Sequence, residues 1–170
     1  MSATMAASAC FIVHDDVPTP PTTPSPDGLR YSLTLPAGLT SPRIARHATR
    51  AVLQTHGLAD MADAAVLAVS ELTGCACRFT QGAEVYLSLR YREDALRVIV
   101  YDGHPRHIHP RLAAACDARR RAALRMLGSV VRACEGEWGF GEAREPGGGT
   151  RLWAVLPRRG SRVFAGLDAG

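Results

Sequence analysis

The sequence predicts an α+β fold, a two-layer sandwich in which an antiparallel or mixed sheet has helices packed on one face. Five short segments are predicted as strands, several of them with alternating apolar residues: 31–35, 85–91, 96–100, 137–142 and 150–156. Three longer segments are predicted as helices: 41–57, 59–79 and 119–134. Their order along the chain, β-α-α-β-β-α-β-β, indicates helices gathered on one side of such a sheet.

The first strand and the first helix have clear boundaries. Pro36 ends the strand, because proline has no N–H to donate to a sheet. Ser41 is predicted as the N-cap of the helix and Pro42 as its first residue, and Gly57 is predicted to end it. The helix face expected to meet the core carries Ile44, Ala48, Ala51 and Val52.

The second helix and the strands that follow it should form the centre of the domain. The segment 59–79 is apolar nearly all round, so we expect a central buried helix. The strands over 85–91 and 96–100 are joined by the short turn Arg92–Asp94, which predicts a β-hairpin.

The last third of the domain is predicted as loop, helix and two strands. Residues 103–111 hold two prolines and three histidines and are expected to be a loop. One face of the helix over 119–134 carries Ala123, Leu127, Val130 and Cys134. The run Pro146–Gly149 joins the last two strands, and it is more simply interpreted as a hairpin turn than as a phosphate-binding loop.

The chain of 170 residues is long enough for one domain with its own core. Residues 1–28 include a proline- and threonine-rich stretch with little to bury, and we predict a disordered segment there. The folded domain is predicted over 29–157 and a flexible tail over 158–170. No apolar run reaches the ~18 residues of a membrane span, and the N-terminus lacks the pattern of a secretory signal.

Charge and cysteine usage narrow the functional classes. The net charge of +4 is too small to indicate direct binding to nucleic acid or to a membrane. The run Arg119–Arg121 is more simply interpreted as a solvated helix face. The five cysteines are odd in number and lack a disulfide-framework spacing, which indicates reduced thiols in the cytoplasm.

One helical stripe combines groups that could line a pocket. Glu71 lies within the most apolar helix, and buried carboxylates are rare unless they have partners. Gly74, Cys75 and Arg78 follow it at the spacings that place side chains on one face. An acid, a gap, a thiol and a cation along one stripe suit the wall of a binding site. The alternative is a purely structural arrangement, either of Glu71 with Arg78 or of Glu71 with the surface.

Asp102 directly follows a buried strand and precedes Gly103. Functional side chains often gather where strands end, so Asp102 is a candidate site residue. The alternative is a turn-forming aspartate whose neighbouring glycine supplies an unusual backbone angle.

The sequence does not predict a metal site. His104, His107 and His109 lie within six residues, and zinc uses such ligands. However, Cys75 and Cys77 lack the usual C-x₂-C spacing, and side chains two residues apart on a helix point in different directions.

Five segments, in this order, resemble the HATPase-type domain of the anti-sigma-factor serine kinases: LPAGLTSPRIARHATRAVL, GLADMADAAVLAVSEL, VYDGHP, EWGF and GGGTRLWAVLP. The resemblance spans Leu35 to Pro157 and extends to the superfamily shared with gyrase and histidine kinases. It implies the Bergerat-like ATPase fold of that superfamily.

The resemblance assigns roles to individual residues. Glu71 matches the family glutamate that deprotonates a water or a substrate serine. Asp102 matches the aspartate that accepts a hydrogen bond from the adenine amino group, and Thr150 matches the threonine that supports this contact. Cys75 stands where the family has the asparagine that binds magnesium, and Phe79 replaces the usual histidine. Arg78 and Gly103 lie in the same two motifs and are counted with the nucleotide-binding positions.

The departures from the family pattern fall at the phosphate end of the implied site. The glycine-rich lid is replaced by RRRAAL over Arg119–Leu124, which lacks both glycines and should be helical. A thiol at Cys75 is a poor ligand for magnesium, which prefers oxygen. Phosphoryl transfer depends on positioning and on charge neutralisation by magnesium. We therefore expect the adenine end to be retained for ATP and the magnesium end to be lost.

Three functions follow from these observations. The first is a regulatory module that binds a sigma factor, an anti-anti-sigma-like protein or a similar partner, with weak or no use of ATP. The second is an active ATP-dependent protein serine kinase with an unusual lid. The third is a thiol or metal sensor that uses Cys75, Cys77 and the histidine loop. The resemblance leaves a homodimer open, and a collapsed cavity beside the Glu71 helix would favour the first function.

Overall fold

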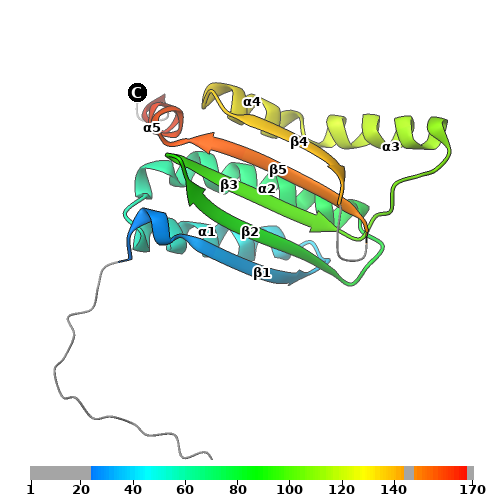
Figure 1. Ribbon diagram of the computed structural model, residues 1–170, viewed down its shortest axis with the longest axis horizontal. Helices are drawn as coiled ribbons and strands as arrows, with labels where there is room; N and C mark the ends of the chain where they lie inside the picture. The colour runs from blue at the N-terminus through cyan, green and yellow to red at the C-terminus, as the bar shows by residue number, and fades with distance from the viewer. Residues whose placement is uncertain (1–23, 144–147, 168–170) are drawn as a thin grey trace, which may run out of the picture.

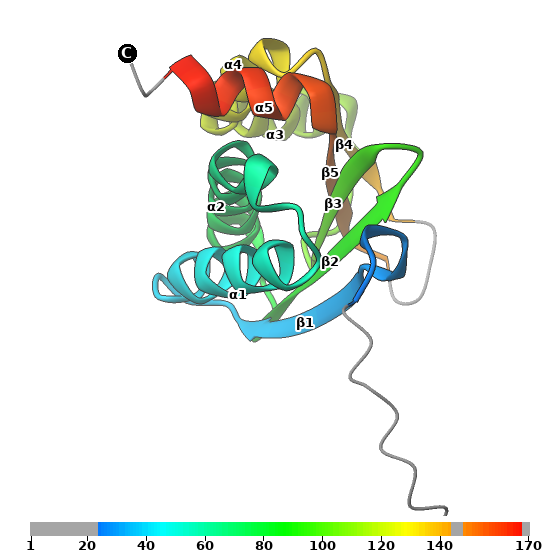
Figure 2. The same cartoon turned by 90° about the vertical axis from the view of Figure 1, so that its left-hand side faces the viewer.

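The computed structural model describes residues 24–143 and 148–167, which form a five-stranded antiparallel sheet with helices on one face (Figures 1 and 2). The strand order is β1-β2-β3-β5-β4. The strands are β1 (Arg30–Pro36), β2 (Glu84–Arg92), β3 (Ala95–Asp102), β4 (Glu137–Glu142) and β5 (Thr150–Pro157). The helices are α1 (Ser41–Thr55), α2 (Ala62–Phe79), α3 (Pro110–Ala123), α4 (Arg125–Ala133) and α5 (Arg158–Leu167), with 3-10 turns at Pro26–Gly28 and Ala59–Met61. The predicted two-layer α+β sandwich is thus confirmed.

The central part of the domain follows the prediction closely. The hairpin β2–β3 turns at Glu93 and Asp94, which both have positive φ near 54°, as the tight two-residue turn requires. Helix α2 lies in the middle of the helical layer, against the sheet and with α1 on one side and α4 and α5 on the other (Figure 2). It contributes nine buried residues, among them Ala68, Val69 and Leu72. The all-round apolar character of this segment therefore reflects burial on most of its faces.

The buried face of α1 differs from the one that we expected. Its buried residues are Ser41, Ala45, Thr49 and Leu53, whereas Ile44 is 48% exposed. The buried stripe combines two small polar residues with an alanine and a leucine. These let α1 lie closely against α2, and a count of large apolar residues overlooks them. As predicted, the helix ends before Gly57, which has φ +68°.

The single helix expected over 119–134 is two helices, and the first begins earlier than predicted. Helix α3 begins at Pro110, inside the segment expected to be loop, with the proline in the first turn. It stops at Leu124, whose backbone leaves the helical region and whose side chain is fully buried. Helix α4 begins directly after this break, at Arg125, and Figure 1 shows α3 extending away from the sheet. The break lets the two helices bury different faces.

The segment after Pro157 is not the flexible tail that we expected, because Arg158–Leu167 forms α5. This helix packs on the helical layer, near α2 and α4 (Figure 2). Arg158 donates to the carboxylate of Asp60 at 3.0 Å, and Ser161 is fully buried. The predicted disordered segment lies, for residues 1–23, outside the described part of the chain. Among the residues that are described, no helix is long and apolar enough to cross a membrane.

Gly160 provides a test of this packing, because a Cβ at this position would clash with the carbonyl group of Cys134. In a solvated helix, Gly→Ala stabilises by about 0.4–1 kcal/mol. In the packed helix, we expect Gly160→Ala to lower the free energy of unfolding by about 1–3 kcal/mol. Urea denaturation measures the difference. Gly38→Ala is the matched control, because a Cβ there meets no atom within 4 Å. An increase in stability for Gly160→Ala would show that α5 is not packed in solution.

Candidate functional site

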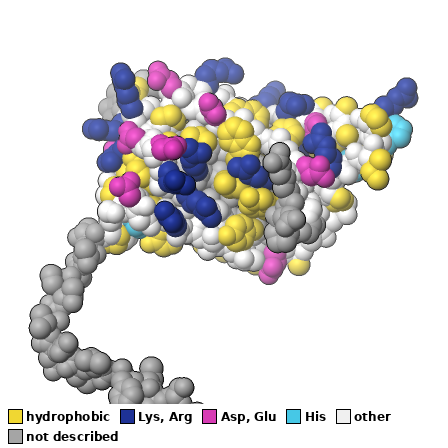
Figure 3. Space-filling model, viewed as in Figure 1, with side chains coloured by type: hydrophobic (Ala, Val, Ile, Leu, Met, Phe, Trp, Pro, Cys, Tyr) yellow, Lys and Arg dark blue, Asp and Glu magenta, His cyan; other side chains and the backbone are white. Residues whose placement is uncertain are grey.

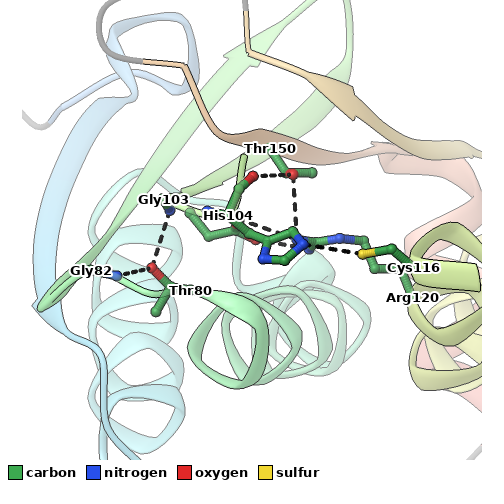
Figure 4. Close-up of polar contacts among 8 residues, drawn as sticks. Thr80, Gly82, Gly103, His104, Cys116, Arg120 and Thr150 are labelled. Carbon is green, nitrogen blue, oxygen red and sulfur yellow. Dashed lines mark hydrogen bonds and ion pairs between the residues drawn. The ribbon is translucent and has the colours of Figure 1, made fainter. Parts of the chain in front are cut away.

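A buried ion pair lies at the place where α3 meets the end of β3. The Arg120 side chain is 1% exposed and that of Asp102 is 0% exposed. Nη1 of Arg120 donates to Oδ2 of Asp102 at 2.8 Å, and Nη2 approaches Oδ1 at 3.4 Å. Figure 4 shows the arginine reaching from α3 toward the ends of the central strands. Arg120 is the one buried residue of α3, so this contact is the main attachment of that helix to the core.

Two further hydrogen bonds extend the pair into the sheet. Nη2 of Arg120 donates to the hydroxyl of Thr150 at 3.3 Å, and this hydroxyl donates to the carbonyl of His104 at 3.0 Å. The backbone N–H of His104 donates to Oδ1 of Asp102 at 2.9 Å. Asp102 therefore also makes a local turn, as its alternative role required, but Gly103 does not adopt the positive φ that was part of that alternative. The result is a closed network joining the ends of β3 and β5 to α3 (Figure 4).

Side chains of α2 form the floor of the site. The guanidinium carbon of Arg120 lies 4.3 Å from the centroid of the Phe79 ring, a cation–π contact. Burial raises the pKa of the Cys75 thiol to about 11, and the nearby Arg120 charge opposes only part of this rise. The thiol is therefore neutral at physiological pH, and a neutral thiol does not bind a hard cation such as magnesium.

The buried charge of Arg120 has the partner and the hydrogen bonds that a charge needs away from water. A charge removed from water is tolerated only when a partner and hydrogen bonds replace its hydration. The planar guanidinium supplies several donors and an aromatic-stacking face at once, which a lysine ammonium cannot do. Burial and then the Arg120 charge lower the pKa of His104, so the nearest imidazole does not add a second cation to the site.

The structure brings together part of the predicted set of site residues. Cys75, Asp102 and Thr150 all surround Arg120. The N–H of Gly103 donates to the hydroxyl of Thr80 at 3.1 Å, which ties the loop to the end of α2. Gly149 lies directly against Asp102, because a Cβ there would clash with its carbonyl oxygen.

The other two predicted residues make no hydrogen bond or ion pair with this cluster among the residues described by the structure. Glu71 is half-buried and Arg78 is exposed. Arg78 is near enough for its charge to act on the Cys75 thiol. Within the same described residues, Glu71 and Arg78 form no ion pair with each other.

Little space remains beside the ion pair. The pocket bounded by His104, Arg120 and Thr150 has a volume of about 20 Å³. This is enough for about one water molecule, whereas pockets for small molecules usually measure several hundred Å³. The carboxylate that the resemblance assigns to the adenine amino group is already paired with the protein's own arginine.

Comparisons with known proteins add no family to this description. No protein-family model matches the sequence. No curated protein matches it either.

Sequence reasoning missed two residues of the site, Arg120 and Cys116. The three consecutive arginines were interpreted as a solvated face, which holds for Arg119 and Arg121, both exposed. Helical geometry already indicates that the three arginines cannot all share one face, because successive residues of a helix differ in direction by about 100°. If this part of the helix packs against the protein, at least one of the three arginines therefore points away from solvent.

The buried pair predicts a characteristic pattern of stabilities. Arg120→Met leaves the Asp102 charge buried without its partner, and we expect a loss of about 3–5 kcal/mol in the free energy of unfolding. Combining Arg120→Met with Asp102→Asn removes both charges and should cost clearly less than the sum of the single changes. Urea denaturation provides all four corners of the cycle. Arg119→Ala, an exposed neighbour, should change stability by about 0.5 kcal/mol or less. Additive single effects would argue against the pair.

Proposed function

We propose that this chain is a regulatory protein that acts by binding another protein, on an anti-sigma-kinase-like ATPase fold, with weak or no use of ATP. The observation that carries the proposal is the ion pair between Arg120 and Asp102. The arginine occupies the carboxylate that the resemblance assigns to adenine, and it also contacts Thr150, the supporting residue. The proposed partner is a sigma factor or an anti-anti-sigma-like protein, and the proposed location is the cytoplasm.

The energy of the pair explains why ATP would be a poor competitor. Before adenine could reach Asp102, the Arg120 side chain would have to leave a position in which both charges are satisfied. Breaking such a buried pair costs about 3–5 kcal/mol. Each 1.4 kcal/mol is a factor of ten in affinity, so adenine recognition would be weakened by roughly two to three and a half powers of ten. The neutral thiol at Cys75 offers no compensating magnesium site.

The face of the sheet without helices suits a protein partner. Cross-strand register places Ser88, Ile99, Trp153 and Gly139 in one row across this face, and Tyr86, Tyr101, Arg151 and Gly141 in the next. The open face of an antiparallel sheet is ordinarily polar. Here Tyr86 is 38% exposed, and Figure 3 shows hydrophobic side chains between arginines on this side. Aromatic residues and arginine are the types enriched at protein interfaces.

The charges on the same face indicate what kind of partner would bind. Arg30, Arg90 and Arg97 stand opposite one another on β1, β2 and β3. Like charges in direct cross-strand positions destabilise a sheet. Among the described residues, Arg97 pairs with Glu93 on the exposed side, and no ion pair is found for Arg30 or Arg90. An acidic segment of a partner protein would neutralise this row of arginines and offset the repulsion between them.

The nucleotide half of the proposal has a direct test. We expect no change in melting temperature when Mg-ATP is added at millimolar concentration to the full chain. A ligand present at 100 times its Kd would stabilise the folded state by about 2.7 kcal/mol, a shift of several degrees. Thermal-shift measurement with and without ATP distinguishes the cases. A clear shift that Asp102→Asn abolishes would support the kinase function instead.

The partner-binding half calls for an affinity capture with matched variants. The tagged chain should retain a sigma factor or an anti-anti-sigma-like protein from extracts of its own cells, identified by mass spectrometry. Arg90→Glu combined with Arg151→Glu reverses two exposed charges on the sheet face and should reduce recovery about tenfold or more. Arg43→Glu combined with Arg159→Glu makes the same charge change on exposed helix residues and should leave recovery unchanged. Equal recovery by both double variants would exclude this face, and recovery of no such regulator would contradict the proposal.

A further inference from the structure

Two histidines and a cysteine meet beside the ion pair, outside the predicted nucleotide residues. His104 and His107 lie in the loop after β3, and Cys116 lies in the middle of α3. One ligand atom from each of the three lies within 4.8 Å of the others. We propose that these three side chains form a binding site for a zinc-type transition metal ion. This site does not depend on the proposed function, because its ligands and its test are separate from the nucleotide residues.

The distances are close to those of a tetrahedral site. Nε2 of His104 lies 3.2 Å from Sγ of Cys116. Zinc bonds of about 2.0–2.1 Å to nitrogen and about 2.3 Å to sulfur, at tetrahedral angles, separate the two atoms by about 3.5 Å. The rings of His104 and His107 lie edge to face, with centroids 5.1 Å apart. A small rotation of the His107 side chain would therefore complete a three-ligand arrangement.

The donor set selects the class of metal. Two imidazoles and a thiolate are borderline-soft ligands of the kind that zinc, cobalt and copper prefer, whereas magnesium and calcium require oxygen. All three side chains are half-buried, so an ion here would be partly shielded from water. The pocket of about 20 Å³ beside them leaves room for a water molecule in a fourth position. Asp117 also lines this pocket, but its carboxylate pairs with Arg106 at 3.6 Å and does not belong to the cluster of three ligands.

Nε2 is the nitrogen of His104 that would bind the metal, because it is the one that faces Cys116. Nδ1 would then carry the proton, and this atom is buried without a hydrogen-bond partner within the described part of the chain. A metal-bound histidine ordinarily donates this second N–H to a carbonyl, a carboxylate or a water. His104 is the central residue of the three, because it contacts both of the others.

Metal binding at this site would act on the buried ion pair through α3. Cys116 and Arg120 are four residues apart and lie on the same face of the helix. His104 and His107 belong to the loop that begins at Asp102. An ion bound to both elements would hold the loop against α3 and so restrain Arg120 at its carboxylate. The effect of the metal on the pair between Arg120 and Asp102 is a separate matter. The experiments that follow test only whether the three side chains bind a metal ion.

Cobalt(II) is a suitable probe, because a thiolate ligand gives it a charge-transfer absorption that a serine cannot produce. We expect the reduced, metal-free full chain to bind one cobalt ion with this absorption and zinc to displace it. Cys116→Ser should abolish the band, and His107→Ala should weaken binding about tenfold or more. His109→Ala and Cys77→Ser are matched controls that should bind like the wild type, since neither residue belongs to the cluster. Absence of the band, or its persistence in Cys116→Ser, would overturn the proposal.

A second measurement avoids dependence on the variants. Alkylation of the wild-type chain, followed by mass spectrometry of its peptides, gives a separate rate for each cysteine. Zinc should slow the reaction of Cys116 about tenfold or more, because a bound thiolate is shielded, while the rate for Cys77 stays the same. Equal rates for Cys116 with and without zinc would exclude it as a ligand.

Discussion

The ion pair between Arg120 and Asp102 is the constraint on which the arrangement of the last third of the domain depends. Neither charge reaches water, so each requires the other and the hydrogen bonds around it. The pair determines where α3 lies, because this helix buries no other residue. The chain then breaks at Leu124, and α4 buries Leu127, Val130 and Val131 in the core.

The two sides of the sheet have different characters, and the proposed function follows from that difference. On the helical side, the site that the resemblance associates with a nucleotide contains the protein's own guanidinium, an aromatic ring and a neutral thiol. On the opposite side, arginines and aromatic residues remain accessible (Figure 3). A protein that had exchanged ligand binding for partner binding would combine these features, since its interior no longer needs to open while its surface must still recognise a partner.

Local patterns predicted most of the fold, and they failed where burial depended on a distant element. The strands, the hairpin and α2 were found because alternation and apolar periodicity are written in the segment itself. The buried face of α1 was misassigned because small residues such as Ala45 and Thr49 lie against α2, while Ile44 faces outward. The sequence predicts a flexible tail where α5 forms, because the attachment of this helix depends on Gly160 and Ser161 packing against other elements, which no local pattern reveals.

For the site, the sequence by itself determined which residues stand at the ends of the strands and along α2: Asp102, Thr150, Cys75 and Phe79. It could not determine what faces them. Three consecutive arginines have the same chemistry, and only the rotation of α3 about its axis and the point where it meets the sheet select Arg120 for burial. The same folding places Cys116, one turn earlier, beside His104. Tertiary structure decided both contacts, because each joins segments whose distance in sequence carries no information about their distance in space.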